Sequence, residues 1–168
     1  MIKAIIAAAL SLVVTQASAY TFTPEGGTRG GGKLDLFYHH VQQLDDYGAE
    51  VRLDMLTCTS ACTYYLTANN VCVGENSLFK FHGPSAGWTG AASFLTGIPV
   101  STITHGMDEK ERSKVIEEMR SVYDSRWPGL GAWFVERASH KHGVNTTDVR
   151  GKSLHNAFGI PFCKGDKK

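Results

Sequence analysis

The sequence lacks an excess of charge of either sign, an internal repeat and any charged low-complexity tract. Its 17 Lys and Arg residues nearly balance 16 Asp and Glu residues, so the formal net charge at pH 7 is +1. Nucleic-acid binding driven by counterion release needs a basic surplus, and a nucleic-acid partner is therefore not expected. With 168 residues, of which 42% are hydrophobic, the chain has the composition of one globular domain.

Long apolar runs are also missing, except for one segment at the N-terminus. Lys3 supplies a positive charge, residues 4–14 are apolar, and Ala17-Ser18-Ala19 has the small residues of a cleavage site. These features predict a signal peptide over residues 1–19 and a mature domain over residues 20–168. The alternative is a membrane anchor, but the apolar run is shorter than the roughly 20 residues that span a bilayer. We expect export to a bacterial periplasm or secretion, with no stable membrane anchor after cleavage.

Cysteine is scarce, with single residues at Cys58, Cys62, Cys72 and Cys163. In an oxidising compartment an even number of cysteines predicts disulfides, and four cysteines allow three pairings, which remain open at this point. The alternative is a metal site formed by Cys58 and Cys62 with His140 and His142, but the chain has no paired CxxC motif to support it. We therefore expect two disulfides, no metal and no cofactor.

Apolar periodicity predicts alternating helices and strands in the first half of the chain. Leu34, Phe37, Val41 and Leu44 recur at intervals of three and four, as on the buried face of a helix. Further on, apolar and polar residues alternate as in a strand. The expected elements are a helix over residues 33–47, a strand over 49–56, a short buried helix over 61–67, and strands over 71–73 and 78–81. This order predicts a parallel α/β arrangement, in which sites gather where strands end and helices begin.

The second half of the chain is mostly helical in its pattern. We expect helices over residues 107–126, 131–142 and 153–158, the last ending at Gly159 as a C-terminal cap. Residues 83–106, rich in Gly, Ala, Ser and Thr, are expected to form either a lid or a hairpin.

Two residues with the chemistry of a hydrolase stand at the ends of predicted strands. Ser60 lies where a strand passes into a helix, and His82 ends the strand over residues 78–81. Taken singly, each is typical of a polar cap. Parallel neighbouring strands would bring the two to one sheet edge, where the imidazole could activate the hydroxyl for attack on a carbonyl carbon. A rival interpretation makes Cys58 or Cys62 the nucleophile, which disulfide formation would prevent.

Three motifs follow one another along the chain: Pro24-Glu25-Gly26-Gly27-Thr28, Thr59-Ser60-Ala61-Cys62 and Phe81-His82-Gly83-Pro84. In order and spacing they resemble motifs of the Clp protease proteolytic subunit in the Clp/crotonase superfamily. The family's versions are an S-P-G-G-S loop, an A-S-M-G nucleophile turn and an I-H-Q-P histidine motif. The resemblance covers residues 21–86, and the helical remainder matches only loosely. It implies an α/β fold with a ClpP/crotonase-like β-β-α spiral core and a helical C-terminal part.

The resemblance also implies roles for individual residues. Ser60 would be the nucleophile and His82 the general base, with the backbone N–H groups of Gly27 and Ala61 as the oxyanion hole. Asp148 would be the third triad member, because it precedes a segment over residues 153–159 that is similar to the family's closing E-E-A-x-x-x-G; the fallbacks are Asp124 and Asp108. The implied protein is an exported serine hydrolase, a peptidase or an enzyme for another acyl substrate, assembled as a homo-oligomer.

The sequence departs from the family pattern around the serine. Cys58 and Cys62 flank it, and Cys62 stands where the family has glycine. If Cys62 pairs with Cys58 or Cys72, the bridge would pin the nucleophile turn, and Cys163 would close the C-terminus onto the core. The mature chain is also shorter than a Clp subunit and has no segment for docking an unfoldase. Two other functions stay open: a catalytically inactive ClpP-like binding or scaffold protein, and a crotonase-type enzyme that binds an acyl thioester.

Overall fold

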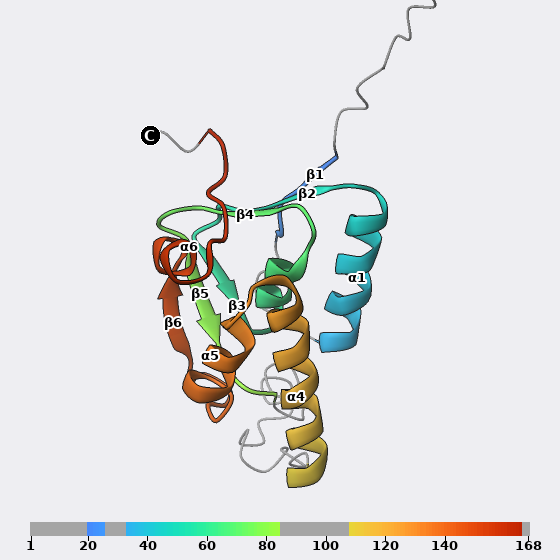
Figure 1. The fold of residues 1–168 in the computed structure, drawn as a ribbon, viewed down its shortest axis with the longest axis vertical. Coiled ribbons are helices and arrows are strands. Elements are labelled where there is room, and N and C mark those ends of the chain that lie inside the picture. The colour runs from blue at the N-terminus through green and yellow to red at the C-terminus, as the bar shows by residue number, and fades with distance from the viewer. Residues whose placement is uncertain (1–19, 26–32, 85–107, 166–168) are drawn as a thin grey trace, which may run out of the picture.

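The computed structural model describes residues 20–25, 33–84 and 108–165, and within these it is a mixed α/β protein with two small sheets (Figure 1). The first sheet is parallel, in the order β1 (Thr21–Phe22), β2 (Glu50–Leu53) and β4 (Val71–Val73). The second has the order β3 (Thr57–Thr59), β5 (Leu78–Phe81) and β6 (Thr147–Arg150), with β3 parallel and β6 antiparallel to β5. The predicted signal peptide, Gly27 and residues 85–106 of the predicted lid or hairpin lie outside the described residues.

Successive strands from β2 to β5 alternate between the two sheets. The sequence pattern predicted one strand over residues 49–56, and this was wrong. Strand β2 ends at Leu53, which is buried in the first sheet, and β3 begins at Thr57, with Cys58 buried in the second. Strand β6 was not predicted at all. Alternation of apolar residues shows which face of a strand is buried, but not which sheet the strand joins.

The helices follow the predictions more closely. They are α1 (Leu34–Asp46), the 3-10 helix η2 (Ser60–Thr67), α4 (Glu109–Arg126), α5 (Leu130–Arg137) and α6 (Gly151–Phe158). Helix α1 buries Phe37, Val41 and Leu44 as expected. The helix predicted over residues 131–142 ends at Arg137, whereas Gly159 caps α6 with a φ of 75°. No helix in the described segments is long and apolar enough to cross a bilayer.

The core gathers around η2, which lies between α1 and α4 (Figure 1). On the α1 side, Nδ1 of His40 lies 2.8 Å from the Tyr65 hydroxyl, and the Phe37 ring packs against the Tyr65 ring. On the α4 side, Nε1 of Trp127 donates to the carbonyl oxygen of Leu66 at 2.6 Å. The short helix that begins at Ser60 is therefore held from both sides.

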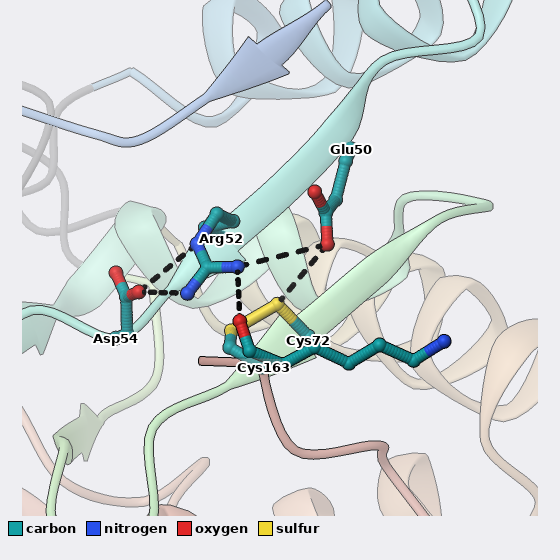
Figure 2. Close-up of polar contacts among 6 residues, drawn as sticks. Glu50, Arg52, Asp54, Cys72 and Cys163 are labelled. Carbon is teal, nitrogen blue, oxygen red and sulfur yellow. Dashed lines mark hydrogen bonds and ion pairs between the residues drawn. A yellow bond between two sulfur atoms is a disulfide. The ribbon is translucent and has the colours of Figure 1, made fainter. Parts of the chain in front are cut away.

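All four cysteines form disulfides, which confirms the prediction of two bridges. One bridge joins Cys58 to Cys62, and the other joins Cys72 on β4 to Cys163 near the C-terminus. Figure 2 shows Arg52 beside the second bridge, with its guanidinium facing Glu50 and Asp54; Nη2 lies 2.6 Å from the Asp54 carboxylate. Bridging leaves no thiolate for the cysteine-nucleophile interpretation or for the alternative metal site.

Candidate active site

Ser60 makes a sharp turn as the first residue of η2, directly after β3. Its φ is 59°, and no other non-glycine residue in the described part of the chain has a positive φ. A left-handed conformation costs a residue with a Cβ about 1–2 kcal/mol, and such strain concentrates at functional sites. A strained turn from strand to helix is also the geometry that projects the nucleophilic serine of α/β-hydrolases.

Ser60 is the first residue of η2, and Ala61, the second residue of this helix, is buried. The first N–H groups of a helix have no partner within the helix, so the N–H of Ala61 can donate to an acceptor on a bound substrate. This position fits the oxyanion-hole role that the resemblance implies. The other predicted donor, Gly27, lies outside the described residues.

His82 leaves the sheet beside the Ser60 turn. Strands β3 and β5 are parallel neighbours, with Thr59 paired to Lys80, so both strands end at the same edge of the sheet. Phe79 and Phe81 are buried on one face of β5, and His82 is the half-buried residue that directly follows the strand. The predicted parallel pairing of the two strands is thus confirmed.

The imidazole of His82 is held in one tautomer by the backbone. Its Nδ1 lies 2.7 Å from the carbonyl oxygen of Gly83, and because a carbonyl can only accept, Nδ1 carries the proton. Nε2 is then the basic nitrogen, which is the form that a general base needs. Gly83 is fixed in turn, because its N–H donates to the Lys141 carbonyl at 3.0 Å. A Cβ at Gly83 would lie 1.9 Å from the carbonyl oxygen of Ser139, so only glycine fits here.

Asp148, the predicted third triad member, lies on β6 opposite Lys80. Its carboxylate is 2.8 Å from Nζ of Lys80 and 2.5 Å from Oγ1 of Thr146. Hydrogen bonds from Lys80 and then Thr146 are the main causes that lower the Asp148 pKa. Among the interactions of the described residues none joins Asp148 to His82, so its role in a triad stays a prediction.

The two fallback acids have other partners. Asp124 accepts hydrogen bonds from the backbone N–H groups of Gly129 and Gly131, at 3.1 and 2.8 Å. Asp108 is the N-cap of α4 and accepts from the Glu111 N–H at 2.8 Å. Both carboxylates therefore fix helix ends.

One cationic side chain, that of Arg112, lies near the end of β5. Nη2 of Arg112 donates to the carbonyl oxygen of Ser139 at 2.5 Å, next to Gly83, while the buried Arg112 Nε has no hydrogen-bond partner among the described residues. Burial is the first cause that lowers the pKa of His142, followed by the nearby positive charge of Arg112.

The buried hydroxyl groups of Thr63 and Tyr123 hold the serine turn in place. Oγ1 of Thr63 donates to the carbonyl oxygen of Ser60 at 2.7 Å, and the Tyr123 hydroxyl lies 2.7 Å from the same Oγ1. Burial raises the pKa of Tyr123 far above its ordinary value, so the phenol stays protonated and can donate to Thr63. Neither residue was predicted from the sequence. The single local signal for this pair in the sequence is a threonine three positions after Ser60, because Tyr123 lies on α4, far along the chain.

Comparison of the chain with protein-family models, with curated proteins and with solved structures found no match. A functional assignment for this protein must therefore come from the geometry of its own residues.

Proposed function

We propose that this protein is a serine hydrolase in which Ser60 is the nucleophile and His82 is the general base. The observation that carries the proposal is the left-handed Ser60 in a turn from strand to helix, beside the strand that ends at His82. The backbone carbonyl of Gly83 supports it further, because that contact leaves Nε2 of His82 free to accept a proton.

The reaction proposed is acyl transfer through a covalent intermediate. Oγ of Ser60 attacks the carbonyl carbon of the substrate while Nε2 of His82 takes the hydroxyl proton. The N–H of Ala61 would donate to the resulting oxyanion, a contribution of roughly 2.7–4 kcal/mol per donor. His82 then passes the proton to the leaving group, and water, activated by the same imidazole, hydrolyses the ester and restores Ser60.

The order of strands supports the resemblance to the Clp/crotonase superfamily. Strands β2 and β3 lie in different sheets and are followed by η2, and β4 and β5 repeat the same switch of sheet. This β-β-α order is the one expected of a ClpP/crotonase-like spiral core. We accordingly propose peptides or related acyl compounds as substrates. The two disulfides are compatible with the proposed export of the protein.

A homo-oligomer is proposed on the resemblance alone. Light scattering on the purified protein at micromolar concentration tests it. A mass of several chains is expected, and the mass of a single chain would overturn this part of the proposal.

The decisive experiment is labelling of the purified, oxidised protein with a fluorophosphonate probe, followed by peptide mapping. We expect the probe on Ser60 and no labelling of Ser60→Ala or His82→Ala. Two matched controls, Ser125→Ala at an exposed serine of α4 and His142→Ala beside His82, are expected to keep the label. A folded wild-type protein that takes up no probe would refute the hydrolase proposal and favour a catalytically inactive binding or scaffold protein.

A further inference from the structure

We infer that the Cys58–Cys62 disulfide is a positioning element of the candidate active site, a covalent strap that holds Ser60 in its left-handed conformation. The inference rests on the proposed function of Ser60 and goes beyond it, because it makes the reactivity of the serine depend on a bridge outside the Ser60/His82 pair.

The bridge closes directly across the turn. Cys58 and Cys62 stand two residues before and two residues after Ser60, and their Cα atoms are 5.4 Å apart. Both cysteine side chains are 0% exposed, so both ends of the disulfide are buried in the core. Cys58 is also fixed by β3, where it pairs with Phe79 of β5. The path of the three residues between the cysteines is therefore constrained at both ends.

Among the described residues, the polar contact that holds the Ser60 backbone besides the bridge comes from Thr63. Thr59, the residue before η2, makes no side-chain capping hydrogen bond, and the carbonyl of Ser60 is held by the Thr63 hydroxyl. A left-handed serine persists only where its surroundings over-determine the backbone. Without the bridge, we expect Ser60 to relax toward the common right-handed region, which would change the direction of its side chain.

The second disulfide provides a matched comparison. Cys72–Cys163 spans a sequence separation of 91 residues, and Cys58–Cys62 spans 4. Stabilisation by a disulfide rises with the logarithm of the loop it closes, so the long bridge contributes more to global stability than the short one. The short bridge should instead act locally, on the serine turn.

The test compares the double variants Cys58→Ala/Cys62→Ala and Cys72→Ala/Cys163→Ala. Each is measured for thermal midpoint, for the rate of fluorophosphonate labelling at Ser60, and for amide hydrogen exchange in peptides covering residues 59–67. For the first variant we expect labelling of Ser60 to slow by about 10-fold or more, because the strained left-handed conformation of Ser60 is no longer held. We also expect amide exchange in residues 59–67 to become faster. For the second we expect the larger fall in thermal midpoint, with labelling and local exchange unchanged at a temperature where it is folded.

Chemical reduction of the Cys58–Cys62 bridge is a reversible form of the test, and it does not replace cysteine with the smaller alanine. In Cys72→Ala/Cys163→Ala a single bridge remains, and a phosphine reduces it to two thiols while the phosphine is oxidised to its oxide with oxygen from water. Labelling is expected to fall on reduction and to return on reoxidation. Unchanged labelling and exchange after removal or reduction of the bridge would overturn the inference and leave the hydrolase proposal standing. If the wild type takes no probe, the hydrolase proposal fails by itself, and the exchange measurement still decides whether the bridge holds the turn.

Discussion

Replacing Thr63 with valine is expected to weaken both the fold and the serine turn. The Thr63 hydroxyl joins α4 to the turn, since it donates to the Ser60 carbonyl and contacts the Tyr123 hydroxyl, both at 2.7 Å. Valine has nearly the shape of threonine, so no cavity forms, and the loss is one of hydrogen bonding.

The magnitude follows from the atoms left without partners. Thr63→Val removes two hydrogen bonds and leaves the hydroxyl of Tyr123, a residue that is 0% exposed, unpaired in the core. An unsatisfied buried group costs about 1–3 kcal/mol, so we expect a total loss of about 2–3 kcal/mol. Tyr123→Phe removes a single bond together with its donor and is expected to cost about 1 kcal/mol.

Tyr64→Phe is the matched control. Tyr64 is a buried tyrosine of η2 whose ring packs against Tyr123, with ring centroids 5.5 Å apart. Its hydroxyl is not part of the described link between Thr63 and the serine turn. Urea unfolding followed by circular dichroism should rank the losses as Thr63→Val, then Tyr123→Phe, then Tyr64→Phe, with slower labelling of Ser60 in the first. Equal stability of Thr63→Val and Tyr64→Phe would refute this reasoning.

Three further predictions concern two single substitutions and one pH titration. Asp148→Asn is expected to keep the Ser60 labelling rate within about 3-fold, because the backbone carbonyl already orients His82; a loss of about 10⁴-fold, as expected for the wrong tautomer, would make the acid part of a triad. Gly131→Ala is expected to destabilise the fold by about 1–3 kcal/mol in urea unfolding, since its Cβ would lie 2.1 Å from the Arg120 carbonyl oxygen and force α4 and α5 apart; wild-type stability would contradict that contact. Burial raises the pKa of Tyr65 to about 12 from an unfolded value of about 10, so the stability it contributes is complete below pH 10 and is lost as pH rises through 12. Part of the tyrosinate absorbance at 295 nm should thus appear only with alkaline unfolding, and complete ionisation of the folded protein near pH 10 would refute this.

The features that the sequence determined by itself are those set by local physical chemistry. Phe37, Val41 and Leu44 recur at helical spacing, and α1 buries these residues. Asp108 precedes an acidic first turn and caps α4, and Gly159 takes the left-handed conformation that ends α6. Each of these outcomes depends on neighbours within a few positions along the chain, which a single sequence displays directly.

The features that only the tertiary structure decided join residues far apart in the chain. Nothing in the alternation of residues 49–56 marks the change of sheet after Leu53, because both strands bury one face. The choice among three disulfide pairings required the approach of Cys163 to β4, and the support of Ser60 by Thr63 required Tyr123 from α4. The candidate site was predictable at Ser60 and His82, where a strand-to-helix turn and a strand end leave a local signature. The partner of Asp148 was not, because β6 pairs with β5 across nearly seventy residues of sequence, and the energy of such a contact depends on packing that no local pattern records.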